Sequence, residues 1–376
     1  MFVELGESLF PEAASESHQL RAYVERLLSA HHCGNIILLP SRRHILSFKS
    51  LGLGYFSNTV LTYISNRLQE YVAASRLASR ILVVHHPSKE ANWRFGDAGK
   101  IHVSMNVLNS ERLHSKAFFL GEHVTDVKLI SALADIYLRS LSYPSLFINF
   151  RSAMGGGSAL AEALAVEEPS PHKGLVVVDR DVATSVPPFR LGTTGRTAFD
   201  RATAMNLCDA SVGWSKVTPM FAFLATWGRM LENYVGPHLL SAYFDSHNRG
   251  LELRLASEAF PNFPNLSEIE MEFWRSINLK DGSNDREMRE SVDAVNALFG
   301  DIPPNMASRL HAISKLKVPG DVLEWVTENY SVSRHTSNIR RAMNSDIKND
   351  SYKAGLETLA NNLLTVAAGD RSALRL

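Results

Sequence analysis

The first third of the chain alternates apolar runs of strand length with longer stretches in which apolar residues recur every three or four positions. The residues that repeat at this helical spacing near the start are Leu20, Tyr23, Val24 and Leu27. The spacing predicts an amphipathic helix. The elements expected in this part are, in order, a helix over residues 17–30, a strand over 35–40, a helix over 58–78 and a strand over 80–84.

A regular alternation of strands and helices begins near residue 116. Its expected elements are a strand over 117–121, a helix over 127–141, a strand over 145–150, a helix over 158–166 and a strand over 174–178. This order predicts a parallel α/β sheet, and the continuous aliphatic run in the last strand indicates burial on both faces. We expect a loop or lid over 182–215, which is rich in Thr, Gly, Pro and Arg, and mainly helices from about residue 218 onward.

Composition narrows the class of protein. Hydrophobic residues make up 45% of the 376 residues and charged residues 21%, as in globular proteins. The 39 basic and 39 acidic residues cancel, so any surface that binds a polyanion must be a local patch. Cys33 and Cys208 lie too far apart for a zinc motif, and we expect two buried structural thiols. No signal peptide and no apolar run of roughly 20 residues are present, which predicts a soluble cytoplasmic protein without membrane contact.

Acidic residues stand directly after two strands of the expected sheet. Glu122 follows the first strand of the alternation, and Asp126 lies in the opening of the next helix. Asp179 and Asp181 follow the third strand, in the sequence VVVDRD. Ligands of an open parallel sheet bind beyond the carboxyl ends of its strands, so we expect these carboxylates to meet there.

Carboxylates that converge repel one another unless a cation lies between them. Hard oxygen ligands favour Mg²⁺ or Mn²⁺ over zinc. In an extended D-x-D segment both side chains point the same way, so Asp179 and Asp181 can face one metal ion. Each feature also has a structural alternative, because acidic residues after strands are common in turns and in the first turn of helices. The ordered combination is more specific than any of its parts.

The segment around the first strand resembles the TOPRIM family of metal-dependent phosphoryl-transfer domains. The sequence FFLGEHVTD, residues 118–126, is similar to the first TOPRIM motif. Glu122 matches the family glutamate, a metal ligand or general acid–base, and Asp126 matches the downstream aspartate. His123 replaces the glycine that usually follows the glutamate.

Later segments extend the resemblance to the overcoming-lysogenization-defect (OLD) nucleases. The glycines at 155–157 resemble the glycine turn after the second strand, and VDRD, residues 178–181, resembles the D-x-D motif. The sequence WGRMLENY, residues 227–234, is similar to the later Glu-Asn-Tyr motif of these nucleases. This resemblance implies that Glu232 is a ligand of a second metal ion.

A lysine further along the chain assists catalysis in that family, typically after a glycine and before a helix. The corresponding stretch is KLKVPGDVL, residues 315–323, in which Asp321 occupies the expected lysine position. Lys317 is the candidate substitute and Lys315 the alternative. The absence of a lysine at this position affects the prediction of cleavage, not the prediction of metal binding.

In those nucleases an ATPase domain precedes the TOPRIM domain and ends in a strand followed by a histidine switch. ILVVHHPS, residues 81–88, resembles this feature, with His86 at the histidine position; a structural loop is the alternative. The chain contains no G-x-x-x-x-G-K-S/T loop, and SRR rather than an acidic pair follows the strand over 35–40. Residues 1–112 are therefore expected to form a vestigial or truncated ATPase-like lobe.

Basic residues near the acidic site are candidate contacts for nucleic acid. Those in the segment expected to overhang the site are Arg190, Arg196 and Arg201. Flexible loops beside a metal cluster commonly contact substrate. Two further basic stretches, 41–49 and 334–348, suit either phosphate contacts or solvated helix faces.

The predicted fold class is α/β, with a parallel-sheet, Rossmann-like TOPRIM core. We predict a mixed N-terminal lobe over 1–112, a TOPRIM-like catalytic domain with helical insertions over 113–325, and a helical C-terminal extension over 326–376.

The predicted function is metal-dependent hydrolysis of phosphodiester bonds in DNA or RNA, with Mg²⁺ or Mn²⁺ as cofactor, in bacterial anti-phage defence as the resemblance implies. The alternative is a weak or inactive TOPRIM subunit that assembles with a separate ATPase subunit. A primase- or topoisomerase-like activity is less well supported, since no zinc ribbon is present. The expected partners are nucleic acid and, beyond it, that ATPase subunit or a second copy of the chain.

Overall fold

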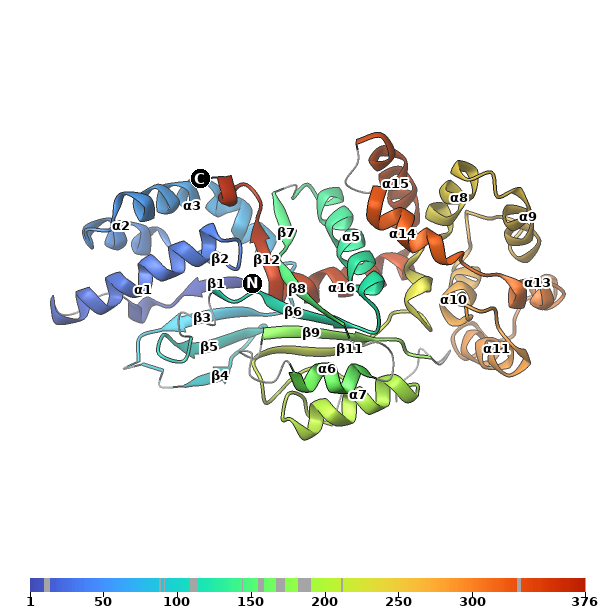
Figure 1. The fold of residues 1–376 in the computed structure, drawn as a ribbon, viewed down its shortest axis with the longest axis horizontal. Coiled ribbons are helices and arrows are strands. Elements are labelled where there is room, and N and C mark those ends of the chain that lie inside the picture. The colour runs from blue at the N-terminus through green and yellow to red at the C-terminus, as the bar shows by residue number, and fades with distance from the viewer. Residues whose placement is uncertain are drawn as a thin grey trace.

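The computed structural model describes residues 1–9, 14–87, 89–90, 92–108, 114–143, 145–154, 159–166, 173–181, 191–210, 212–329 and 333–375. Two five-stranded sheets lie side by side in the middle of the molecule, and a group of helices extends beyond the second sheet (Figure 1). The protein is thus a mixed α/β structure with parallel strands, as predicted. None of the described helices is long and apolar enough to cross a membrane.

The first sheet is built from the N-terminal part of the chain. Its strand order is β2-β1-β3-β5-β4, and all neighbours are parallel except β4 and β5. The strands are β1 (Phe2–Leu5), β2 (Ile37–Leu39), β3 (Ile81–His85), β4 (Trp93–Phe95) and β5 (Lys100–Ser104). The helices are η1 (Glu7–Leu9), α1 (Ala14–His32), α2 (Arg42–Ser50) and α3 (Tyr55–Ser75). They share one apolar core with the sheet, and α1, β2, α3 and β3 match the predicted elements.

The SRR sequence after β2 opens a helix. The amide of His44 donates to the hydroxyl of Ser41, at 3.2 Å, which caps the N-terminus of α2. The residues that stand where an ATPase would carry an acidic pair therefore begin and cap a helix.

The second sheet has the order β10-β11-β9-β6-β8, parallel except for β10. The strands are β6 (Ala117–Gly121), β8 (Phe150–Met154), β9 (Lys173–Val178), β10 (Gly213–Trp214) and β11 (Met220–Ala225). The helices on its faces are α5 (Val124–Ser140), α6 (Leu160–Val166), α7 (Thr193–Ala204) and α16 (Asp350–Ala367). Figure 1 shows α5 and α6 on opposite faces.

Burial on both faces explains the aliphatic run of β9. Leu175 and Val177 belong to the core that α5 and α16 complete. Val176 and Val178 belong to the core that α6 and α7 complete. Alternate residues of one strand thus enter two different cores, as the continuous apolar pattern predicted.

Three features in and beside the second sheet differ from the sequence-based prediction. The strand expected over 145–150 is divided: β7 (Leu146–Ile148) pairs antiparallel with a strand near the C-terminus, and β8 is the parallel neighbour of β6. Part of the segment expected as a loop forms α7, which buries Ala198, Phe199 and Ala202 against the sheet. Finally, β11 lies in the region expected to be mainly helical. The glycines at 155–157 lie outside the described residues.

The region after β11 is otherwise helical, as predicted. Its elements are η3 (Leu231–Tyr234), α8 (Pro237–Ser246), α9 (Gly250–Ala259), α10 (Glu268–Ser276), α11 (Asp285–Phe299), α12 (Pro304–Ala307), α13 (Leu310–Lys315), α14 (Gly320–Asn329) and α15 (Ser333–Asp346). Side-chain caps define the start of α10, where Ser267 and Glu270 form a capping box, and of α11, where Asn284 accepts from two amides.

The C-terminal segment returns to the first sheet. After α16 the chain forms β12 (Ala368–Asp370), which pairs with β7, and then η4 (Ala373–Arg375). The fully buried carboxylate of Asp370 accepts hydrogen bonds from the hydroxyls of Tyr63 and Tyr71 on α3. The helix α16 contributes to the apolar cores of both sheets, so this end of the chain joins the two halves of the molecule.

Candidate active site

The carboxyl ends of two adjacent parallel strands position the predicted acidic residues. Leu120 of β6 lies opposite Val176 of β9, so Glu122 and Asp179 emerge at the same edge of the sheet. On its other side β9 pairs with β11 as far as Val178. The chain continues from β11 across the end of β9, which places the segment 226–234 over the D-x-D sequence.

Hydrogen bonds fix this crossing segment to the D-x-D sequence. The amide of Leu231 donates to Oδ1 of Asp179 at 2.8 Å. The amide of Asp181 donates to the carbonyl oxygen of Arg229, also at 2.8 Å. One oxygen of Asp179 is thereby engaged by the backbone, and the positions of both aspartates depend on the segment that carries Glu232.

The remaining residues of the Glu-Asn-Tyr motif brace that segment. The side chain of Asn233 is fully buried and donates to two carbonyl groups at the end of α10, while its oxygen accepts from the amide of Met230. The hydroxyl of Tyr234 accepts from the amide of Trp227 at 3.0 Å. Leu231 and Asn233, the residues on either side of Glu232, are therefore both held by hydrogen bonds.

The structure brings the five predicted acids into one electrostatic group, the acidic cluster. Its members are Glu122, Asp126, Asp179, Asp181 and Glu232. Burial is the largest cause that raises the pKa of each of these carboxyls. The pKa of Asp179 lies well above its ordinary range, because the other four members add their repulsion to the effect of burial. Asp181 and Asp126 likewise raise the pKa of Glu122.

The members of the acidic cluster differ in whether their carboxylate oxygens already accept hydrogen bonds from the protein. Oε1 of Glu122 is buried and has no hydrogen-bond partner. Oδ2 of Asp126 accepts from the amide of His123 at 2.8 Å at the start of α5, so the helix-cap alternative holds for this residue. Glu122 is the member with a buried acceptor left to use.

Asp181 sits in an unusual backbone conformation. Its φ is +59°, in the left-handed region that non-glycine residues seldom occupy. A side chain at Gly192 would place its Cβ 2.0 Å from Oδ2 of Asp181. The start of α7 therefore approaches this carboxylate closely only because residue 192 is glycine.

A lysine that the sequence did not single out lies in the field of the acidic cluster. Burial lowers the pKa of Lys280, but Glu232, Asp179 and Asp126 raise it more, and the net change is upward. Lys280 stands in the turn between α10 and α11, where its amide donates to Oδ1 of Asn278 at 3.2 Å. The only sequence signal was a lysine in a tight turn, KDGSN, directly before a capped helix.

The lysine chosen from the sequence occupies a different position. Lys317 is exposed and packs beside Gly282, and it is not among the charges with the largest effects on the acidic cluster. Asp321 forms an ion pair with Arg249 at 2.8 Å. The charges around the acidic cluster thus favour Lys280 over Lys317. Sequence order alone does not reveal which of the two lysines lies near the acids.

The arginines predicted to contact nucleic acid lie on a helix rather than in a loop. Arg196 is exposed on α7 and pairs with Asp200 one turn further on, at 3.1 Å. Arg201 is exposed on the same helix. Arg190 lies outside the described residues.

The histidines compared with an ATPase switch lie at the carboxyl end of β3. Nε2 of His85 is 2.7 Å from Nδ1 of His102 on the neighbouring strand β5. The amide of His86 donates to the hydroxyl of Ser8 at 3.1 Å.

The expectation that both cysteines are buried is wrong for one of them. Cys208 is buried, but Cys33 is exposed.

The geometry sets a limit on metal binding. Among the described residues, no three or more His, Cys, Asp or Glu side chains are arranged so that they could hold a metal ion together. The members of the acidic cluster raise the pKa values of Asp179 and Glu122, but the described residues do not form a ready-made set of three metal ligands. Comparison of the chain with models of protein families, with curated proteins and with solved structures finds no match.

Proposed function

We propose that the chain is a metal-dependent phosphodiesterase that acts on nucleic acid, of the TOPRIM type found in OLD nucleases and, as that resemblance implies, in anti-phage defence. The observation that carries the proposal is the acidic cluster, in which five carboxylates from three segments gather at the carboxyl edge of a parallel sheet beside Lys280. Clusters of groups with strongly shifted pKa values are typical of functional sites.

The acidic cluster fits a hard divalent cation such as Mg²⁺ or Mn²⁺. Its donors are carboxylate oxygens, and one of them, Oε1 of Glu122, is buried without a partner. A positive charge would also relieve the repulsion that raises these pKa values. Mg²⁺ commonly takes one or two carboxylates from the protein and keeps several waters, which agrees with a site that offers no ready-made set of three ligands.

Four members of the acidic cluster and Lys280 then have definite tasks. Glu122 and Asp179 would hold one cation, and Asp181 and Glu232 a second. When bound, such cations polarise a phosphodiester and lower the pKa of coordinated water. Lys280 would offer its positive charge to the phosphate as negative charge develops there. The backbone bond from Leu231 keeps one oxygen of Asp179 fixed throughout.

The test measures cleavage of single- and double-stranded DNA and RNA by the purified chain with Mg²⁺ or Mn²⁺. We expect cleavage by the wild type, none by Glu122→Gln, and a strong loss for Lys280→Met but not for Lys317→Met. Glu258→Gln, at an exposed carboxylate on α9, is the matched control. Calorimetric titration with Mn²⁺ should show weaker binding to Glu122→Gln, a readout independent of activity. Undiminished cleavage by Glu122→Gln would refute the assignment.

A second candidate is a TOPRIM subunit without cleavage activity that assembles with an ATPase. Two observations favour it: the absence of a phosphate-binding G-x-x-x-x-G-K-S/T loop from the sequence, and the lack of a finished metal cage among the described residues. It predicts that the chain co-purifies with a separate ATPase and that the complex cleaves no nucleic acid with either metal. Cleavage that Glu122→Gln abolishes would decide against it.

A further inference from the structure

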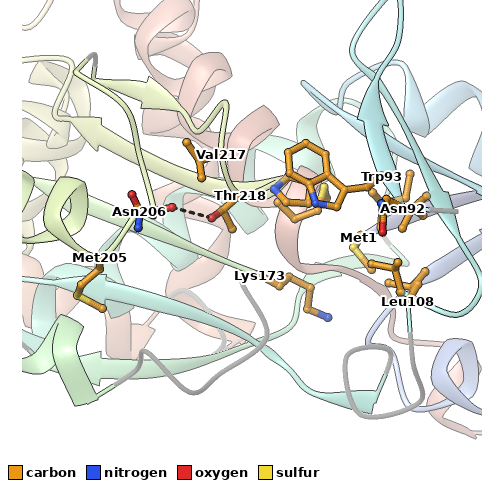
Figure 2. A pocket seen from close by; sticks show the side chains of 14 residues that line it. Met1, Asn92, Trp93, Leu108, Lys173, Met205, Asn206, Val217 and Thr218 are labelled. Atoms are coloured by element: carbon orange, nitrogen blue, oxygen red, sulfur yellow. Dashed lines mark hydrogen bonds between the residues drawn. The ribbon is translucent and has the colours of Figure 1, made fainter.

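A cavity of about 460 Å³ lies between the two sheets, at the opposite end of β9 from the acidic cluster. Figure 2 shows side chains from both sheets around it. The residues that define its walls are Leu82, Trp93 and Val103 from the first sheet, Lys173 and Met220 from the second, and Thr218 from the segment before β11. Its volume falls within the roughly 300–1,000 Å³ that is usual for sites of small molecules.

The walls of the cavity are mostly apolar, and its mouth is open. Leu82, Val103 and Met220 are almost fully buried. Val217, another residue of the lining, is 47% exposed, so part of the lining of the described cavity faces solvent. The indole of Trp93 is half-buried and offers a flat surface for a planar group.

One charged side chain is buried in this apolar wall. Lys173 is 6% exposed, and its Nζ donates to the carbonyl oxygen of Ser115 at 2.7 Å. Among the described residues, no carboxylate pairs with it. Burial lowers the pKa of Lys173 to about 7, because the apolar surroundings disfavour the charged amine. A buried amine in this setting gains from any anionic group that enters the cavity.

The two sheets are fixed to one another next to the cavity, so the cavity is formed in advance. The guanidinium of Arg80, just before β3, donates to the carbonyl oxygens of Ser215 and Pro219 at 3.2 and 3.0 Å. It also lies between the rings of Phe95 from the first sheet and Trp214 from the second, at 4.9 and 4.7 Å. Sites formed in advance bind more tightly, since less freedom is lost on binding.

We propose that this cavity binds a small ligand with a flat, apolar body and one carboxylate group. The carboxylate pairs with the amine of Lys173, and the body lies against Trp93 and the aliphatic side chains of both sheets. This site is separate from the acidic cluster, and the inference does not depend on phosphodiesterase activity.

The experiment compares two probes that share one body but differ in charge, 2-naphthoate and 2-naphthamide. Binding to the full chain is measured at about pH 6.5 by calorimetry. We expect one binding site, with 2-naphthoate bound at least roughly tenfold more tightly than 2-naphthamide, as for a charge-assisted contact. Lys173→Met should abolish this preference and leave the affinity for 2-naphthamide unchanged. Lys116→Met, at an exposed lysine directly after Ser115, should retain the preference.

A second variant tests the location independently of charge. Val103→Phe fills the cavity and should weaken binding of both probes by at least about tenfold, while circular dichroism confirms that the chain is folded. Equal affinities for the two probes in the wild type, an unchanged preference in Lys173→Met, or no binding of either probe would each overturn the proposal. These binding experiments do not depend on nuclease activity. A negative result here would therefore not count against the proposed nuclease function, and the reverse also holds.

Discussion

Replacing Asp179 with asparagine should make the protein more stable in the absence of divalent cations while it removes a proposed metal ligand. Asparagine has the same shape and can still accept the hydrogen bond from the amide of Leu231. It lacks the negative charge that the other members of the acidic cluster repel. Stability and function should therefore change in opposite directions at this position.

The expected magnitude follows from two opposing terms. Two like charges about 8 Å apart repel by about 2 kcal/mol at an effective dielectric constant near 20. Four other carboxylates raise the pKa of Asp179 in this way. Against this, a neutral acceptor weakens the bond to Leu231 by about 1 kcal/mol relative to a charged one. A net stabilisation of at least about 1 kcal/mol is expected, or about 1 °C in Tm for a chain of 376 residues.

The sign of the pH dependence is fixed by the direction of the shift. Because the pKa of Asp179 is raised in the folded protein, folding retains a proton that the unfolded chain has lost. The stability of the wild type therefore falls as the pH rises above about 4, the ordinary pKa of an aspartate, until the folded carboxyl has also ionised. Asp179→Asn lacks this contribution, so its advantage should be near zero at pH 4 and largest at pH 8.

Thermal unfolding followed by circular dichroism, with a chelator present, measures this difference. Addition of Mg²⁺ should raise the Tm of the wild type more than that of Asp179→Asn, because bound cations stabilise the folded state. If Asp179→Asn is no more stable than the wild type at pH 8, or if its advantage is the same at pH 4, the repulsion inferred for the acidic cluster is not present.

Two further predictions test other parts of the structure. Gly192→Ala should displace the carboxylate of Asp181 and lower the free energy of unfolding by about 1–3 kcal/mol, whereas Gly320→Ala, at a glycine with open space around it, should be neutral; chemical denaturation of both variants checks this. His238→Gln should cost about 1 kcal/mol at pH 6 and less at pH 9. The bond to Asp346 raises the pKa of His238, so its contribution is complete below about 6.5 and disappears as the pH passes the raised value; denaturation curves at the two pH values that superimpose would contradict this.

The acidic cluster shows which residues of the candidate site the order of motifs in the sequence could predict. The sequence predicted which strand ends bear carboxylates, and the structure places all five chosen acids in one electrostatic group. It did not predict Lys280, since that residue comes under the influence of the acids through a turn between α10 and α11, which are distant from β6 and β9 in the sequence. The sequence placed Asp126 in the opening of a helix, and only the structure shows that its carboxylate accepts from the amide of His123 there.

The sequence by itself determined the elements whose signal is local. Helical spacing located α1, α3 and α5, and aliphatic runs located β3, β6 and β9, because side-chain periodicity follows directly from the geometry of the backbone. The tertiary structure alone decided which partner each short strand takes. It pairs β7 with β12, more than 200 residues away, and β8 with β6. It also closes a cavity around Lys173 from two sheets, and neither result has a local signature, because pairing and enclosure depend on segments that are distant in the chain.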